Sequence, residues 1–165
     1  MRIALIADED RVLHEQAAVN RMAIGLIAAG IQVTRVVPDE RTDLAPDPTE
    51  ARLALAPRIE TPMRVLPWWR ASRARRVADE MERELPNLIY AIGEKAWTLA
   101  LDLAALIERP VAIDLWSAEQ LRHLPRGRHT EWIAAYVAPT RPFADALRRR
   151  VETHLVCRIP PGVDV

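Results

Sequence analysis

The feature that most constrains this chain is a repeated succession of short apolar runs and longer stretches with apolar residues at helical spacing. Residues 3–7 form an apolar run, residues 19–29 have the spacing of a helix, and Gly30 stands where a helix C-cap is expected. Residues 31–37 then return to a β-branched run. Strands that are apolar throughout indicate a parallel sheet covered on both faces, so this start predicts a βαβ unit.

The rest of the chain continues the alternation after a proline-rich stretch at residues 39–57, which predicts a long surface loop with one helical turn near residues 50–56. The pattern predicts strands at residues 63–66, 88–92, 111–115, 132–138 and 154–159, and helices at residues 73–85, 94–107 and 142–150. The expected fold class is α/β: a Rossmann-like, doubly wound, mostly parallel sheet of six or seven strands with helices on both faces. A length of 165 residues, half of them apolar, suits one domain with its own core.

The composition excludes several classes of function. The 23 basic and 23 acidic residues give a formal net charge of zero, so we expect no nucleic-acid partner. Cys157 is the single cysteine, which fits a reducing compartment, and no stretch approaches the ~20 apolar residues needed to cross a bilayer. The first apolar run meets an acidic triplet and lacks a cleavage site, so we expect a buried strand there and not a secretion signal. We expect a cytoplasmic protein.

The expected ligand site lies where the strand order of such a sheet reverses. If the order is 3-2-1-4-5-6, this crevice opens between the strand that ends at Ala7 and the strand that ends at Ile92. Loops at residues 8–16 and 93–95 would then face one another. Asp8, Glu9 and His14 on the first loop are candidate ligand-binding residues, since carboxylates suit hard cations and sugar hydroxyls, although a solvated loop fits the same residues.

The second half of the expected site follows the fourth and fifth strands. Gly93, Glu94 and Lys95 open a helix whose free N–H groups and dipole favour an anion, although Glu94 also suits an ordinary first-turn acid. Asp114 ends a strand just before Trp116, and it suits either an acceptor hydroxyl or the capping of the next turn. These residues complete the candidate substrate-binding set. None is assigned as catalytic.

Other motifs narrow the chemistry. Trp68-Trp69 beside several arginines is typical of core packing, of stacking on a sugar or of contact with a membrane interface, which leaves peripheral membrane association open. The four histidines lack metal-ligand spacing, so surface or core packing is expected for each. No G-x-G-x-x-G follows the first strand and no P-loop is present, so no cofactor is predicted.

Four segments carry a family resemblance, namely residues 86–96, 109–114, 136–143 and 158–165. The first three are similar to strand-and-turn steps of the N-terminal, acceptor-side domain of GT-B fold glycosyltransferases of the retaining family 4 type. The last resembles the Pro-x-Gly-Val-Asp signature that joins the two domains of such enzymes. The resemblance spans nearly the whole chain. It implies no divalent ion at the sugar, so no metal is predicted.

The resemblance implies that residues 1–159 form a Rossmann-like N-terminal domain and that residues 160–165 begin an interdomain linker. A C-terminal domain of the same parent protein would bind the nucleotide-sugar, and this half would receive a sugar or lipid-linked acceptor and be inactive alone. Many family members carry a Gly-Gly pair after the first strand and histidines after the fourth and fifth. This chain has no glycine there, and it has Ile92 and Trp116 near the histidine positions.

A second interpretation is a receiver-like phosphoacceptor or another non-catalytic α/β binding module. The acidic cluster after the first strand suggests it. A receiver also needs an aspartate closing the third strand and a lysine after the fifth. Here the third predicted strand runs into Trp68-Trp69 and Lys95 follows the fourth, so the transferase interpretation is preferred.

Overall fold

The computed structural model describes residues 1–39, 53, 56–81 and 85–159, with the side chains of residues 9–17 left out of the description. These residues form seven strands and four α-helices joined by short 3-10 turns. The strands are β1 (Arg2–Ala7), β2 (Gln32–Val37), β3 (Arg58–Glu60), β4 (Leu88–Ile92), β5 (Val111–Asp114), β6 (Ile133–Ala138) and β7 (Val156–Arg158). The helices are α1 (Glu9–Ala28), α2 (Arg70–Glu80), α3 (Glu94–Ile107) and α4 (Arg141–Arg148), and the 3-10 turns are η2 (Pro67–Trp69), η3 (Gln120–Arg122), η4 (Thr130–Trp132) and η5 (Thr153–Leu155).

All seven strands form one parallel sheet in the order β3-β2-β1-β4-β5-β6-β7. The predicted order 3-2-1-4-5-6 is therefore confirmed, and β7 adds a further strand beyond β6. The strands β1 to β3 are added in one direction across the sheet and β4 to β7 in the other, so the order reverses at the β1–β4 pair, where Ala7 lies opposite Ile92. This pair is the switch point at which parallel α/β sheets open their ligand crevice.

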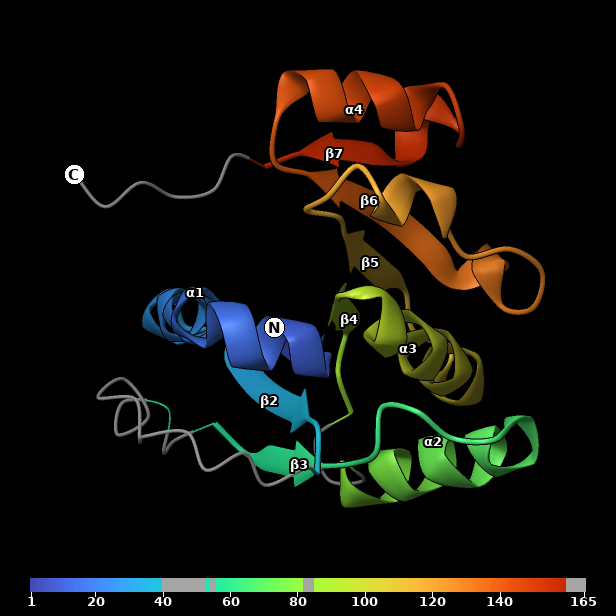
Figure 1. Cartoon of the computed structure of the whole chain (residues 1–165). Helices are drawn as coiled ribbons and strands as arrows, with labels where there is room; N and C mark the ends of the chain where they lie inside the picture. Colours follow the sequence, from blue (N-terminus) through green and yellow to red (C-terminus); the bar gives the residue numbers. More distant parts are fainter. Residues whose placement is uncertain (40–52, 54–55, 82–84, 160–165) are drawn as a thin grey trace.

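Helices cover both faces of the sheet (Figure 1), as expected. On one face, α1 packs Ala23 and its neighbours on Leu5 and Val33. On the other face lies the larger core, to which α2, α3 and α4 contribute buried side chains. These include Val77, Leu99, Leu103, Ala144 and Leu147, all fully buried. The chain thus has the predicted doubly wound α/β architecture.

The first helix begins ten residues earlier than predicted. Residues 8–16 were expected to be a loop, and this was wrong, because α1 runs from Glu9 to Ala28. The physical reason is visible in the sequence: acidic residues suit the first turn of a helix, and no proline or glycine interrupts the chain before Gly25. Gly30 ends the helix with φ +77°, and its N–H donates to the carbonyl of Ile27 at 2.9 Å, as the C-cap prediction requires.

The third strand was also misplaced, since β3 is Arg58–Glu60 and not residues 63–66. An edge strand needs few buried side chains, and in β3 only Ile59 is buried, opposite Val36. The apolar run at 63–66 instead leads into η2, and α2 begins at Arg70, three residues early. From β4 onward each element lies within two residues of its prediction. The predictions for residues 40–52, 54–55 and 82–84, and for the linker at 160–165, lie outside the described residues.

Candidate functional site

The carboxyl ends of the central strands line up in one row. Ala7, Ile92, Asp114 and Val137 are successive partners across β1, β4, β5 and β6. The residues that follow these ends therefore meet at one edge of the sheet. Most predicted site residues lie there: Asp8 after β1, Gly93, Glu94 and Lys95 after β4, and Asp114 and Trp116 at and after the end of β5.

Asp8 joins β1 to the start of α3. It is 2% exposed, its N–H donates to the Ile92 carbonyl at 3.1 Å, and its carboxylate Oδ2 accepts the Lys95 backbone N–H at 3.2 Å. A carboxylate in this position satisfies one of the free N–H groups of the helix and interacts favourably with the helix dipole. Asp8 is thus an N-terminal cap for α3, supplied from 87 residues away in the chain.

Gly93 is matched to Asp8. Its backbone has φ 88° and ψ 153°, a region that residues with a side chain rarely adopt. A Cβ atom added to Gly93 would overlap all three atoms of the Asp8 carboxylate group. Glycine is therefore required here both by the backbone and by the close approach of Asp8. The position expected for a ligand anion at the start of α3 holds the protein's own carboxylate.

Asp114 is 4% exposed and accepts a hydrogen bond from the Tyr90 hydroxyl. Burial raises the pKa of Tyr90 well above its ordinary value, and the charge and hydrogen bond of Asp114 raise it further. The turn after β5 is capped by another side chain, because Gln120 Oε1 accepts the backbone N–H groups of Trp116 at 2.7 Å and of Ser117 at 3.1 Å. Gln120 therefore caps the turn after β5.

The remaining predicted residues take different positions. Trp116 is 36% exposed at the edge beside Asp114. Glu9 and His14 lie in the first two turns of α1, and their side chains fall outside the described residues. The acidic triplet is therefore divided between a strand end and a helix, and Asp8 is buried at the start of α3.

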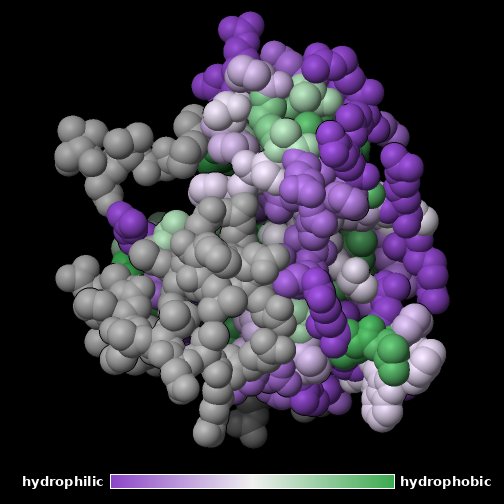
Figure 2. Space-filling view, in the orientation of Figure 1, coloured by the Kyte–Doolittle hydropathy of each residue, from purple (hydrophilic) through white to green (hydrophobic). Residues whose placement is uncertain are grey.

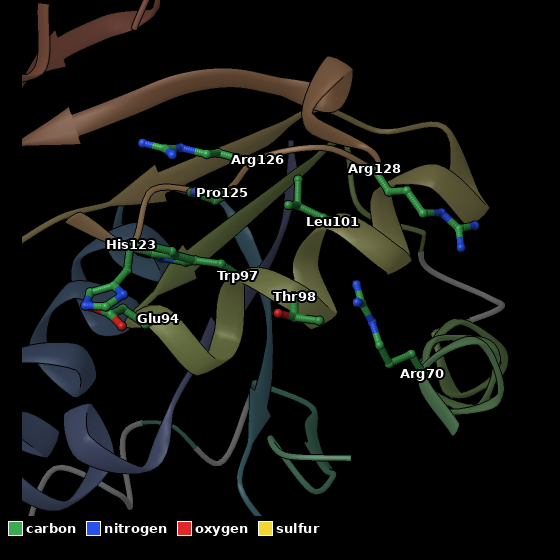
Figure 3. A pocket seen from close by; sticks show the side chains of 9 residues that line it. All are labelled: Arg70, Glu94, Trp97, Thr98, Leu101, His123, Pro125, Arg126 and Arg128. Atoms are coloured by element: carbon green, nitrogen blue, oxygen red, sulfur yellow. The ribbon is translucent and has the colours of Figure 1, made fainter. Parts of the chain in front are cut away.

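A groove of about 420 Å³ runs along the outer side of α3 (Figure 3). Glu94 and His123 lie at one end of it, and Arg70 and Arg128 at the other. The lining between them consists of Trp97, Thr98, Leu101, Pro125 and Arg126. The groove combines apolar side chains with a mostly cationic rim, which suits an amphiphilic or anionic ligand.

Sequence reasoning had found Glu94 but not His123, Arg126 and Arg128. The available signal was a run of basic residues at 122–129 that contains no acid and is interrupted by Pro125 and Gly127. The run does not indicate that it lies beside α3, because this contact is made only by the fold. Among the residues that the structure describes, no group of His, Cys, Asp or Glu is arranged to hold a metal ion. Within the same residues no helix has the length and apolarity to span a membrane.

The strand order argues against the alternative of a receiver domain. Receiver domains have the order 2-1-3-4-5, which places the third strand beside the first and joins their acidic ends. Here β3 lies at the sheet edge beyond β2 and ends in Glu60, separated from β1. The acidic end of β1 therefore has no partner carboxylate from β3, and Leu115 follows β5 where a lysine would be needed.

No protein-family model matches the sequence, and no curated protein matches it. Solved structures do match in fold. HepE from Anabaena in complex with UDP and glucose is similar with a TM-score of 0.66 and 14% identity, over 99% of this chain and 45% of HepE. A glycosyltransferase from Rickettsia africae gives a TM-score of 0.71 and 9% identity, over 99% of this chain and 43% of that protein.

MurG from Acinetobacter baumannii gives a TM-score of 0.63 and 10% identity, over 99% of this chain and 46% of MurG. At such identities the likeness establishes the fold, and it confirms a Rossmann-like α/β domain of the kind found in GT-B glycosyltransferases. The chain spans slightly less than half the length of these three proteins.

Proposed function

We propose that this chain is the acceptor-side domain of a cytoplasmic, retaining glycosyltransferase of the family 4 type, and that a second domain of the same protein binds the nucleotide-sugar. One observation carries the proposal: the fold of this chain, a seven-stranded parallel sheet with its switch point at β1 and β4, is similar over 99% of the chain to glycosyltransferases about twice as long. One of these similar structures holds UDP and glucose. Rossmann-like sheets bind ligands at this carboxyl edge.

The capping of α3 supports the proposal that the acceptor binds this domain and the donor binds the second domain. A donor diphosphate would be attracted by free N–H groups at a helix start. In this chain the Asp8 carboxylate already occupies that place, and a phosphate there would be repelled by it. The diphosphate therefore belongs on the second domain. We expect this domain alone to bind an acceptor without transferring a sugar to it.

The acceptor would lie against the edge formed by Glu94, Asp114 and Trp116. Glu94 is partly exposed at the start of α3 and lines the groove, so its carboxylate is available to acceptor hydroxyls. Trp116 presents an exposed part of its ring, and indole rings stack on the apolar faces of sugars. Transfer would occur in the cleft between the domains, where positioning and stabilisation of the departing diphosphate provide the acceleration. The acceptor is a free or a lipid-linked sugar.

The test measures ligand binding to the chain. Binding is detected as a shift in melting temperature and as NMR chemical-shift changes. We expect a response to an acceptor sugar or a short-chain lipid-linked sugar, and a much smaller response to UDP-glucose. Glu94→Gln should weaken acceptor binding about tenfold, the loss of one charge-assisted hydrogen bond. Glu108→Gln is the matched control, because Glu108 follows the far end of the same helix and is exposed.

Two results would contradict the proposal. One is the absence of any response to a broad panel of acceptors. The other is tight binding of the nucleotide-sugar to this chain alone, because that would place the donor on the domain assigned to the acceptor.

A further inference from the structure

The turn before α2 displays an apolar surface formed by Leu66, Trp68 and Trp69, here called the tryptophan turn. These side chains are 55%, 72% and 59% exposed. Figure 2 shows hydrophobic atoms at the lower right of the molecule, where Figure 1 places the start of α2. Tryptophan pairs normally bury at least one ring, and here neither ring is buried. Because exposed apolar surface is unfavourable in water, we expect a partner that covers the turn.

The tryptophan turn is held firmly in place. The N–H of Trp69 donates to the Leu66 carbonyl at 2.9 Å, and the Ser72 hydroxyl donates to the Trp69 carbonyl at 2.9 Å. Just beyond the turn, Arg70 makes two hydrogen bonds with Asp102 of α3, at 2.9 and 2.8 Å. The two rings are therefore presented by a backbone whose order is independent of any partner.

The loop before the turn is anchored from beneath. Arg73 is 5% exposed, and its Nη1 donates to the carbonyls of Pro62 at 3.1 Å and Met63 at 2.7 Å. Burial lowers the pKa of Arg73, while the nearby Asp102 charge opposes that shift. Because the buried Arg73 guanidinium donates to two loop carbonyls, it fixes the path of the chain toward the exposed tryptophans.

The surroundings of the tryptophan turn are strongly cationic. Residues 61–78 contain five arginines and no acidic residue, in a chain whose formal charge is zero. Arg64 and Arg75 are exposed, and the structure gives neither of them an ion pair among the described residues. Arg126 and Arg128 add charge from the rim of the groove, at whose far end Arg70 and Arg128 lie together (Figure 3).

We infer that the tryptophan turn docks this domain on an anionic lipid surface, with the indole rings at the headgroup level and Arg64 and Arg75 on the lipid phosphates. Tryptophan and leucine beside arginine are the residues that settle at membrane interfaces, and negative lipids attract such clusters. At about 150–250 Å² per large side chain, the turn exposes on the order of 400 Å², about half of what each partner contributes to a specific protein interface. A lipid surface needs no matching protein shape.

Docking would also define the acceptor, and this consequence rests on the proposed function. The groove along α3 begins at Arg70, next to the tryptophan turn, and ends at Glu94 on the carboxyl edge. A lipid-linked sugar anchored in the bilayer could place its phosphate among the arginines and its sugar near Glu94. The favoured acceptor is therefore a lipid-linked sugar phosphate and not a free sugar.

The experiment measures binding of the whole chain to vesicles of phosphatidylcholine, alone or mixed with phosphatidylglycerol, by co-sedimentation and by tryptophan fluorescence with brominated lipids. We expect binding to the anionic vesicles with quenching of tryptophan emission. The double variant Trp68→Ala/Trp69→Ala should lose about tenfold or more in partitioning, since two rings leave the interface. Arg64→Gln and Arg75→Gln should each lose about fivefold on anionic vesicles and little on neutral ones.

Matched controls separate docking from general damage. Ile159→Ala removes another exposed apolar side chain, and Arg149→Gln another exposed arginine. Both lie at the β7 end of the sheet, away from the turn, so both variants should bind like the parent. The conservative variant Trp68→Phe/Trp69→Phe should keep most of the binding but lose most of the quenching, because its three other tryptophans lie elsewhere.

Parent-like binding by the tryptophan-to-alanine variant would overturn the inference, as would no binding by the parent chain. A parent dimer that this variant dissociates in lipid-free ultracentrifugation would assign the turn to a second copy and overturn it too. Binding of a soluble short-chain acceptor to the same variant tests the proposed function separately. If that binding persists while vesicle binding was never present, docking fails and the acceptor site stands.

Discussion

The pairing of Gly93 with the Asp8 carboxylate makes Gly93→Ala the most informative single substitution in this chain. A methyl group at residue 93 meets two obstacles. The backbone at φ 88° and ψ 153° is unfavourable for alanine, and the new Cβ would overlap the Asp8 carboxylate. The overlapped atoms belong to the Asp8 side chain. Because Asp8 is 2% exposed, this side chain has no open space into which it can move. The cap on α3 should therefore be lost.

The magnitude follows from these two effects. Placing alanine in a region that is essentially restricted to glycine costs about 2 kcal/mol. Displacing Asp8 leaves the Lys95 N–H without its 3.2 Å acceptor and a buried carboxylate with poorer hydrogen bonding, for about 2 kcal/mol more. The free energy of unfolding should fall by about 4 kcal/mol in total, a large part of the 5–15 kcal/mol typical of a domain. The melting temperature should fall by roughly 10 °C.

Other glycines of the chain isolate each effect. Gly30 has φ +77° with no atom within 4 Å of an added Cβ, so Gly30→Ala should show a backbone effect alone, about 1–2 kcal/mol. Gly25 lies exposed in α1 with the same open space and no positive φ, so Gly25→Ala should stabilise the protein by about 0.5–1 kcal/mol. In an Asp8→Ala background, Gly93→Ala should fall to its backbone effect of about 2 kcal/mol.

The assay is urea unfolding followed by circular dichroism for the parent, the three glycine variants, Asp8→Ala and the double variant. The coupling between residues 8 and 93 should be about 2 kcal/mol. If Gly93→Ala is no more destabilising than Gly30→Ala, or if its effect is unchanged when Asp8 is removed, the close approach of the carboxylate is not what requires glycine at this position.

Two further predictions concern buried polar groups. Because burial and Asp114 raise the folded-state pKa of Tyr90, the unfolded chain releases that proton first, so stability should be complete below about pH 10 and fall by up to about 1.4 kcal/mol per pH unit above it. Tyr90→Phe should reduce this slope in unfolding measured against pH; an unchanged slope would refute the assignment. Asp102→Asn should lower the free energy of unfolding by about 1–2 kcal/mol, because it breaks the bidentate pair with partly exposed Arg70, whereas Asp145→Asn on an exposed pair should change it by less than about 0.5 kcal/mol. Equal effects of the two asparagine variants in chemical unfolding would count against a structural role for Asp102.

The part of the chain from β4 onward could be predicted closely because its signals are local. The apolar run 88–92, the glycine at 93 and the helical spacing of 94–107 are each contained in neighbouring residues, and β4 and α3 have those very bounds. The misplaced third strand has the opposite cause. Arg58–Glu60 buries one side chain, so it carries almost no apolar pattern, and its pairing with β2 alone makes it a strand.

The candidate site was predicted as a location but not as an arrangement. The expected edge between Ala7 and Ile92 is present, and Asp8 meets Lys95 there. The role of Asp8 as a cap could not be foreseen, because no spacing rule relates a residue to a backbone N–H 87 positions away. The prediction of a loop at residues 8–16 was wrong for a different, local reason: acidic residues suit both a loop and a first helical turn.

The amino-acid sequence by itself determined that this chain would build a parallel α/β sheet with its polar residues at the strand ends, because hydrophobic period and glycine placement act over a few neighbouring residues. The tertiary structure alone decided three things: that Asp8 fills the start of α3, that the 122–129 loop and α3 enclose a groove, and that Trp68 and Trp69 remain uncovered. Each depends on which distant segments become neighbours. That choice is made by strand order and packing, which no local period encodes.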